Sequence, residues 1–258
     1  MPLETSTSND EDKYIVDVGM NHGEDSEYYF RRGYKVIGIE ANPVVARDAS
    51  ASFARQGVEV TVVNKAISNK EGRLPFYVNK TSDKWSSLIE GIGSRVHGSE
   101  VIEVETVNLK DVLEPYSGRI HYVKIDIESM DHVALEQTME LSMLPRYVSV
   151  ENGNERMLDL LSAQGYQSFH FSNQKHVPDQ RVPADTRQGT FVDHRFKPGT
   201  SGLFGDDLRG KWLTIEEAYM VNEAIVRGKQ AITQTHLWAE AVGWFDLHAS
   251  TDKPGWLK

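Results

Sequence analysis

Short β-rich apolar runs alternate with helical stretches along most of this chain of 258 residues, and this alternation constrains the fold more than any other feature. Buried strands are predicted at residues 14–18, 35–39, 58–63, 121–125 and 146–150. Helices are predicted at about 24–32, 43–56, 131–139 and 154–163. Strands that alternate with helices at this spacing imply a parallel, doubly wound α/β sheet of the Rossmann-like type.

The segments between and after these elements follow a looser pattern. Short strands are predicted at 74–78 and 101–107, on either side of a polar Gly/Ser segment. Residues 166–171 and 190–194 could form two late strands around a polar loop. We therefore place the α/β domain at residues 13–196, after a polar tail at residues 1–12.

Residues 197–258 differ in composition from the domain that precedes them, and their first part is rich in glycine. The run from Thr214 to Glu217 forms a capping box, which predicts a helix that continues to about Val226. A second, Trp-containing helix is predicted between about Gln230 and Leu247. We expect a C-terminal helical extension that either packs on the sheet or acts as a lid or a homo-oligomer surface.

Charge and composition exclude several classes of function. Lys and Arg total 28 against 38 for Asp and Glu, a formal net charge of -10, which argues against a broad nucleic-acid face or a polybasic membrane contact. The absence of Cys excludes disulfides, Cys-ligated zinc and thiol catalysis. No signal-peptide pattern or long apolar run is present. These features predict a cytoplasmic protein with a small-molecule or peptide partner.

The strongest chemical motif is VDVGMNHG, where the first predicted strand turns into a helix. Ligands of open α/β sheets bind at the carboxyl ends of strands, and Gly19 and Gly23 allow the backbone to approach such a ligand closely. A dinucleotide site would have Gly-x-Gly-x-x-Gly, whereas this turn has Gly-x-x-x-Gly with Asp17 two residues before it. The Asp17 carboxylate would repel a pyrophosphate but suits the cationic, amino-acid end of S-adenosylmethionine.

Glu40 ends the second predicted strand, 23 residues after Asp17. A carboxylate at this position can accept hydrogen bonds from both ribose hydroxyls of a nucleoside. Proteins that bind nicotinamide cofactors share this feature with those that bind S-adenosylmethionine. Glu40 therefore supports a nucleoside ligand without choosing between the two.

Polar side chains also follow the strands at 121–125 and 146–150. Asp126, Glu128 and His132 follow the first of these strands, and Glu151 ends the second. Methyl transfer to oxygen or nitrogen requires an aligned acceptor and a base that removes its proton where necessary. Asp126, Glu128 and Glu151 are the predicted catalytic residues, although paired carboxylates could also bind a divalent cation.

These residues carry a resemblance to the FkbM family of S-adenosylmethionine-dependent methyltransferases. The similarity runs from Tyr14 to about Phe196, through the segments VDVGMNHG, GIEANP, NKAISNKEGRLPFYV, VKIDIESMDHVAL and VSVEN. The most family-specific piece is KIDIES, in which Ser129 stands where the family has Gly. The stretch from Trp85 to Leu88 resembles the Ser-containing stretch before the family's central strand.

The resemblance implies a class I methyltransferase sheet with an antiparallel last strand and S-adenosylmethionine as cofactor. It also implies a set of cofactor-binding residues along the carboxyl edge of the sheet: Asp17, Gly19, Asn21, His22, Gly23, Glu40, Ala41, Asn42, Ala66, Ser87 and Asp126. No metal-binding residue is predicted. Most such enzymes methylate hydroxyl groups of sugars or natural products, and some relatives methylate carboxylates of peptides.

Three alternatives remain open from the sequence. A nicotinamide-dependent oxidoreductase would share the fold and Glu40, but this chain lacks the Gly-x-Gly-x-x-Gly motif of such enzymes. A non-catalytic binding module would give no reason for Asp126, Glu128 and Glu151 to converge. The third alternative concerns the acceptor, because a carboxyl group of a peptide or acid would use the same residues as a hydroxyl group.

Overall fold

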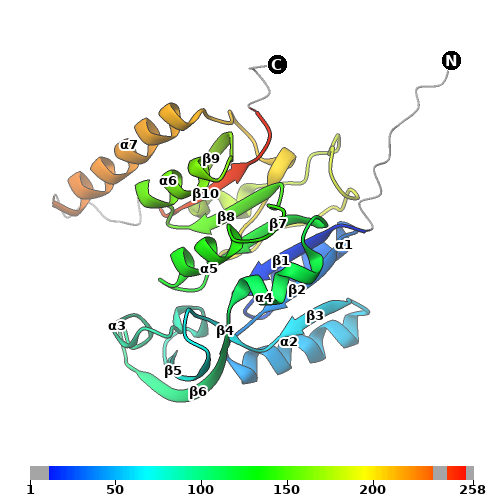
Figure 1. Cartoon of the computed structure of the whole chain (residues 1–258), viewed down its shortest axis with the longest axis vertical. Coiled ribbons are helices and arrows are strands. Elements are labelled where there is room, and N and C mark those ends of the chain that lie inside the picture. Colours follow the sequence, from blue (N-terminus) through cyan, green and yellow to red (C-terminus); the bar gives the residue numbers. More distant parts are fainter. Residues whose placement is uncertain (1–11, 235–242, 254–258) are drawn as a thin grey trace.

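The computed structural model describes residues 12–234 and 243–253, and its framework is a seven-stranded sheet (Figure 1). The strands lie in the order β3-β2-β1-β7-β8-β10-β9. Their bounds are β1 Tyr14–Val18, β2 Lys35–Ile39, β3 Val60–Val63, β7 Ile120–Ile125, β8 Tyr147–Glu151, β9 Ser168–Asn173 and β10 Phe245–Ser250. The strands from β3 to β8 are parallel, whereas β10 runs antiparallel to both β8 and β9. The expected doubly wound sheet with an antiparallel last strand is confirmed.

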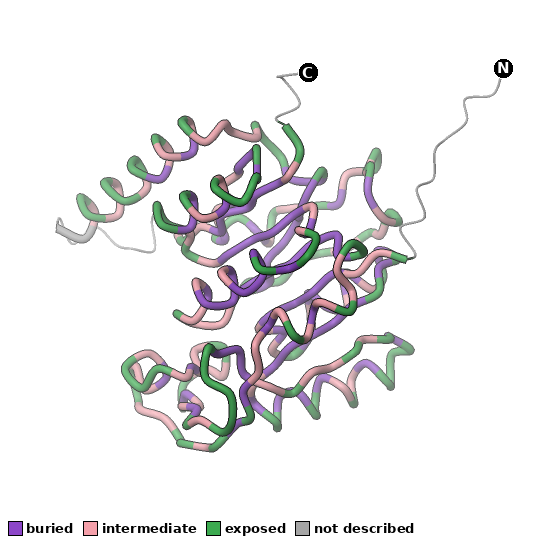
Figure 2. The backbone as a smooth tube through the Cα atoms, in the orientation of Figure 1, coloured by how far each residue is buried: buried purple, intermediate pink, exposed green. Residues whose placement is uncertain are grey.

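Helices cover both faces of this sheet. One face packs against α4 (Leu109–Leu113), α5 (Asp131–Thr138), α6 (Glu155–Ala163) and the start of α7 (Ile215–Gln234). The other face packs against α1 (Glu24–Arg31) and against buried aromatic and aliphatic side chains of residues 177–208. Figure 2 shows the sheet as the most continuously buried part of the molecule. Because β1 and β7 are buried on both faces, most of their residues are apolar, with Asp17, His121 and Lys124 as the exceptions.

Local sequence determines where the elements near the carboxyl edge begin. Helix α2 (Pro43–Gln56) starts at Asn42, whose side chain accepts a hydrogen bond from the backbone N–H of Val44, and Pro43 occupies the first helical position. Gly57 ends the helix in a left-handed conformation, with φ of 64°. The first two strands and helices therefore lie where the sequence predicts them.

A second, three-stranded sheet projects from the domain (Figure 1). It consists of β4 (Ala66–Ile67), β6 (Ser99–Val107) and β5 (Gly72–Asn79) in that order. The segment between β5 and β6 carries the short helix α3 (Glu90–Gly93). We call residues 72–107 the small-sheet arm.

Two predictions for the later part of the chain are wrong. Residues 190–194 form no strand, and Phe245 to Leu247 belong to β10 instead of to a second helix. The predicted first helix is confirmed as α7, which continues to Gln234, while residues 235–242 of the predicted second helix lie outside the described residues. The run FDLHAS pairs with β8 on one side and β9 on the other and is buried from Asp246 to Ser250, so its burial does not alternate and gives no period-2 strand pattern.

Candidate functional site

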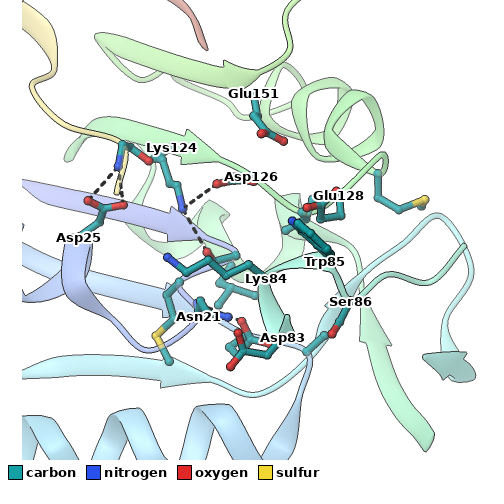
Figure 3. Close-up of a pocket in the computed structure, with 18 of the residues that line it drawn as sticks. Asn21, Asp25, Asp83, Lys84, Trp85, Ser86, Lys124, Asp126, Glu128 and Glu151 are labelled. Carbon is teal, nitrogen blue, oxygen red and sulfur yellow. Dashed lines mark hydrogen bonds and ion pairs between the residues drawn. The ribbon is translucent and has the colours of Figure 1, made fainter. Parts of the chain in front are cut away.

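A cavity of about 280 Å³ opens at the carboxyl ends of the parallel strands (Figure 3). Its walls come from the turns after β1, β2, β7 and β8, from the small-sheet arm, and from residues near 200 and 245. Eight of the predicted site residues line it: Gly19, Asn21, Glu40, Ala41, Ala66, Asp126, Glu128 and Glu151. The predicted catalytic carboxylates and most of the predicted nucleoside-contacting residues therefore share one cavity.

Five predicted cofactor-binding residues do not line this cavity. Asp17, Gly23, Asn42 and Ser87 are built into the structure around it, and the His22 side chain is exposed and lies 2.6 Å from Asp83. Asn42 serves as the cap of α2, and Ser87 donates a hydrogen bond to the backbone carbonyl of Glu128. None of these five residues is among those that line the cavity, and they support the residues that do.

The glycine turn after β1 brings backbone against backbone. Gly19 has φ of +84°, and a Cβ atom there would lie 1.9 Å from the carbonyl oxygen of Asp126. Gly23 has φ of +83°, and a Cβ atom there would lie 2.2 Å from the ring of Phe53. Both positions therefore require glycine, because a side chain would collide with its neighbour and strain the backbone. This close approach leaves the cavity lined by main-chain atoms at β1.

Glu40 is held in place by two backbone amides. Its two carboxylate oxygens accept hydrogen bonds from the N–H groups of Asn42, at 2.8 Å, and Asn21, at 3.0 Å. Burial raises the pKa of Glu40 to about 7, and the two amides oppose that rise. Since each carboxylate oxygen has two acceptor sites, one on each oxygen is left for a ligand.

Asp17 acts through a buried ion pair. Its carboxylate lies 3.0 Å from Nζ of Lys124, its register partner on β7, and accepts a hydrogen bond from Ser26 at 2.7 Å. Lys124 also donates to the carbonyl of Gly19 at 3.1 Å and lies 3.8 Å from Asp126 (Figure 3). Burial opposes the charge of Lys124, but the carboxylates, Asp17 foremost, raise its pKa well above the ordinary value. Asp17 thus fixes the ammonium group that reaches the cavity.

The loop after β7 adopts an unusual backbone conformation. Glu128 and Ser129 have φ of 53° and 76°, in the region that favours glycine. The Asp131 carboxylate accepts hydrogen bonds from the N–H groups of Ile127 and Ser129, both at 2.9 Å, and stabilises the turn. The left-handed conformation explains why glycine would suit position 129.

The small-sheet arm closes over this loop. Arg95 donates two hydrogen bonds to the Glu128 carboxylate, at 2.9 and 2.7 Å, and its guanidinium lies 4.9 Å from the centre of the Trp85 ring. On the other side of the cavity, Nζ of Lys84 donates to the carbonyl of Gly199 at 3.0 Å. The arm is therefore attached both to the loop after β7 and to the glycine-rich segment near residue 200.

Glu151 and Asp246 form the far wall of the cavity. They are register partners on the adjacent strands β8 and β10. Burial, followed by the nearby carboxylates of Asp126 and Glu128, raises the pKa of Glu151 to about 9. Burial and the carboxylates of Asp126 and Glu151 also raise the pKa of Asp246 well above its ordinary value. The wall therefore contains two acidic groups whose charged forms are disfavoured by burial.

Sequence reasoning missed several lining residues, and the reason is their position in the chain. Asp25, Lys124, Gln174, Trp244 and Asp246 all line the cavity. Lys124 was part of the KIDIES motif and carried a recognisable signal, whereas residues 174 and 244–246 lie in segments without a pattern. Asp25 accepts two hydrogen bonds from the N–H of Ser201, at 3.1 and 2.9 Å, which attaches the segment near residue 200 to α1.

The described residues were also considered as possible metal ligands and as possible membrane-spanning helices. No group of three or more His, Asp or Glu side chains in residues 12–234 and 243–253 has a geometry that could hold a metal ion. Within the same ranges, no helix has the length and apolar character needed to cross a membrane. A second pocket is lined by Ser129, Asp131 and His132, and it shares Glu128 and Glu151 with the main cavity.

Comparisons with known proteins agree with the geometry. The sequence profile described as "Methyltransferase FkbM domain" matches residues 17–168, more than half of the chain. No curated protein sequence matches this chain significantly.

Similar solved structures include several methyltransferases. One is an rRNA methylase from Streptococcus thermophilus (12% identity, 70% of this chain and 83% of that chain, TM-score 0.34). Another is a predicted O-methyltransferase from Agrobacterium tumefaciens (11% identity, 65% and 68%, TM-score 0.37). A further similar structure is described as "Conversion of a Disulfide Bond into a Thioacetal Group during Echinomycin Biosynthesis" (13% identity, 55% of this chain, TM-score 0.31), and this chain spans only 43% of it. At such TM-scores these likenesses carry no argument about substrate.

Proposed function

The chain belongs to the FkbM family of S-adenosylmethionine-dependent methyltransferases, and from this we propose that it methylates a hydroxyl oxygen of a small molecule such as a sugar or natural product. The observation that carries the proposal is that a ribose-type carboxylate, Glu40, and a carboxylate suited to proton removal, Asp126, line the same cavity. When bound, S-adenosylmethionine supplies a sulfonium methyl group, whose C–S bond breaks as the new O–C bond forms.

The cofactor end of the cavity fits an adenosylated amino acid. Glu40 has one acceptor site free on each carboxylate oxygen, which suits two ribose hydroxyls. The buried side-chain oxygen of Asn21 has no hydrogen-bond partner, and the wall at Gly19 has no room for a side chain. Ala66 and Phe76 add apolar surface where an adenine ring would lie. These residues would bind and orient the cofactor, and the small-sheet arm, with Trp85, would exclude water from the cavity.

The carboxylates near the ends of β7 and β8 have different proposed roles in the reaction. Asp126 lies 3.8 Å from the Lys124 ammonium, and it lines the cavity after β7, the strand between β1 and β8. Glu151, with its pKa raised to about 9, is protonated near neutral pH in the empty enzyme. We therefore assign Asp126 as the base that takes the hydroxyl proton, and Glu151 and Glu128 as groups that orient the acceptor.

Titration calorimetry tests the cofactor, and product chemistry tests the acceptor class. We expect micromolar binding of S-adenosylmethionine and S-adenosylhomocysteine and no binding of NAD. Radiolabelled methyl groups transferred to hydroxyl acceptors should survive mild alkali as ethers, whereas methyl esters of carboxylates would release methanol. Alkali-labile label would contradict the hydroxyl assignment, and binding of NAD alone would contradict the whole proposal.

A further inference from the structure

The two ends of the cavity differ in where they lie along the sheet. Glu40 follows β2, Gly19 follows β1, and Asp126 follows β7, while Glu151 and Asp246 lie on β8 and β10. Neighbouring strands are about 4.8 Å apart, so Glu151 and Asp246 lie on the order of 10–15 Å from the glycine turn. A cofactor that spans Glu40 and Gly19 therefore leaves the β8–β10 wall for the acceptor.

Charge compensation is incomplete at this wall. Glu128 is paired with Arg95, and Asp126 lies near Lys124. Glu151 and Asp246 have no hydrogen bond or ion pair from their side chains among the described residues. As register partners on adjacent antiparallel strands, their Cβ atoms are about 5 Å apart, a spacing at which like charges destabilise a sheet.

Two buried polar atoms at this wall also have no partner. Oδ1 of Asp246 is buried without a hydrogen bond, on a residue that is 6% exposed. Nε2 of Gln174 is likewise unpartnered, on a residue that is 5% exposed, and its backbone N–H bonds to the carbonyl of Trp244. Both residues line the cavity. Since buried polar atoms are normally hydrogen-bonded, these atoms point to a ligand that supplies the missing partners.

We propose that Glu151 and Asp246 bind a protonated amine of the methyl acceptor, with Gln174 donating a hydrogen bond to an oxygen of the same molecule. The acceptor is then an amino-hydroxy compound, such as an amino sugar or an aromatic amino alcohol. The inference rests on the proposed methyltransferase function and names its substrate class. Trp85 and Trp244, which also line the cavity, supply aromatic surface next to a cation.

Binding of an ammonium group would change the protonation of the pair. The charged groups that act on Glu151 and Asp246 are the carboxylates of Asp25, Asp126, Glu128 and Asp131 and the ammonium of Lys124. Burial and the neighbouring carboxylates raise the pKa values of both groups, which favours their protonated forms. A bound cation favours the charged carboxylates, so binding releases protons and strengthens as pH rises toward the pKa of the amine.

The test compares matched ligands in the presence of saturating S-adenosylhomocysteine. The pairs are glucosamine against glucose and tyramine against 4-ethylphenol, measured by calorimetry in two buffers of different ionisation enthalpy. We expect the amine of at least one pair to bind roughly tenfold more tightly than its neutral partner, with release of protons. Equal binding within both pairs, or no binding of either amine, would overturn the proposal.

Variants separate the acceptor site from the cofactor site. Asp246→Asn and Glu151→Gln should each reduce the preference for the amine below roughly threefold. The exposed Glu223→Gln on α7 serves as the matched control and should keep the wild-type preference. A preference that survives in both site variants would also overturn the proposal.

Cofactor titrations of the same samples distinguish the possible failures. If S-adenosylhomocysteine does not bind to the wild type, the proposed function itself fails. If it binds but the amines show no preference, only the acceptor class fails. If Asp246→Asn weakens S-adenosylmethionine roughly tenfold more than S-adenosylhomocysteine, the pair serves the sulfonium charge and the amine proposal is overturned.

Discussion

The two halves of the cavity differ in how their polar groups are satisfied. At the β1–β2 half, Glu40 is bonded to two backbone amides, and Asp17 is paired with Lys124. At the β8–β10 half, Glu151 and Asp246 are register partners whose side chains make no hydrogen bond or ion pair with any described residue. The first half is organised by the chain itself, whereas the second depends on the charge of whatever enters. A site can therefore be rigid toward its cofactor and still leave specificity to unpaired groups.

The largest expected effect comes from breaking the pairing in the β1–β2 half. Lys124→Met leaves the carboxylate of Asp17 buried without its ion-pair partner, which should lower the free energy of unfolding by about 3–5 kcal/mol. Urea unfolding followed by circular dichroism measures the change. The double variant with Asp17→Asn should recover much of that loss, and a loss no larger than that of an exposed Lys70→Met control would contradict the pairing.

Cofactor affinity gives the next effect. Glu40→Gln keeps the shape of the side chain but replaces one acceptor oxygen by an amide donor that faces a backbone N–H. Lost charge-assisted hydrogen bonds of about 1.5–3 kcal/mol correspond to roughly 10- to 100-fold weaker binding of S-adenosylhomocysteine. Calorimetry should find unchanged affinity in Glu59→Gln, whose side chain is exposed. Equal affinities of the two variants would remove Glu40 from the cofactor site.

The acidic half should show its character in the pH dependence of stability. A carboxyl group with a raised pKa binds more protons in the folded state, so its contribution is present below the unfolded pKa and is lost as pH rises. For Glu151 this window extends from about 4.5 to about 9. The empty enzyme should therefore lose stability across this range, and Glu40, with a pKa of about 7, adds to the loss over the lower part of it.

Removing one carboxylate of the pair should reduce that loss. Asp246→Asn should stabilise the empty protein near pH 9 by on the order of 1 kcal/mol, because it removes a like charge opposite Glu151. Thermal unfolding at pH 6 and pH 9 measures the difference between variant and wild type. A variant less stable than wild type at both pH values would indicate that the pair contributes to folding instead of opposing it.

The smallest expected effect concerns closure of the small-sheet arm. Arg95→Ala removes two hydrogen bonds to Glu128, which is partly exposed, so the cost is on the order of 1 kcal/mol. Hydrogen exchange at residues 83–98 should become roughly fivefold faster, with little change in binding of S-adenosylhomocysteine. Arg73→Ala, at an exposed pair on β5, is the control. Unchanged exchange would mean that other contacts hold the arm.

Sequence patterns predicted the β1–β2 half well because its chemistry is local. The strand, the glycine turn and Glu40 lie within 27 residues of one another, from Tyr14 to Glu40, and the turn geometry at Gly19 requires glycine. Asp17 was predicted to contact the cofactor. In the structure its carboxylate lies 3.0 Å from Nζ of Lys124, its register partner on β7. A pairing across two strands leaves no spacing rule that sequence alone can reveal.

The other half escaped prediction because its partners meet only in the folded sheet. Asp246 lies 95 residues after Glu151, and the aromatic content around Trp244 suggested a helix. Insertion of β10 between β8 and β9 is a property of the topology, and no local preference of the run FDLHAS indicates which strands flank it. The family match also ends at residue 168, before Gln174 and Asp246.

The place of β10 has a consequence for synthesis of the protein. Among the strands that the structure describes, β9 has β10 as its one neighbour in the main sheet, so it has no strand partner there until residues 245–250 have left the ribosome. The strands that carry Gly19, Glu40 and Asp126 have all been made more than a hundred residues earlier. During synthesis the β1–β2 half of the cavity can therefore form first. The wall with Glu151 and Asp246 is completed last, when β10 inserts between β8 and β9.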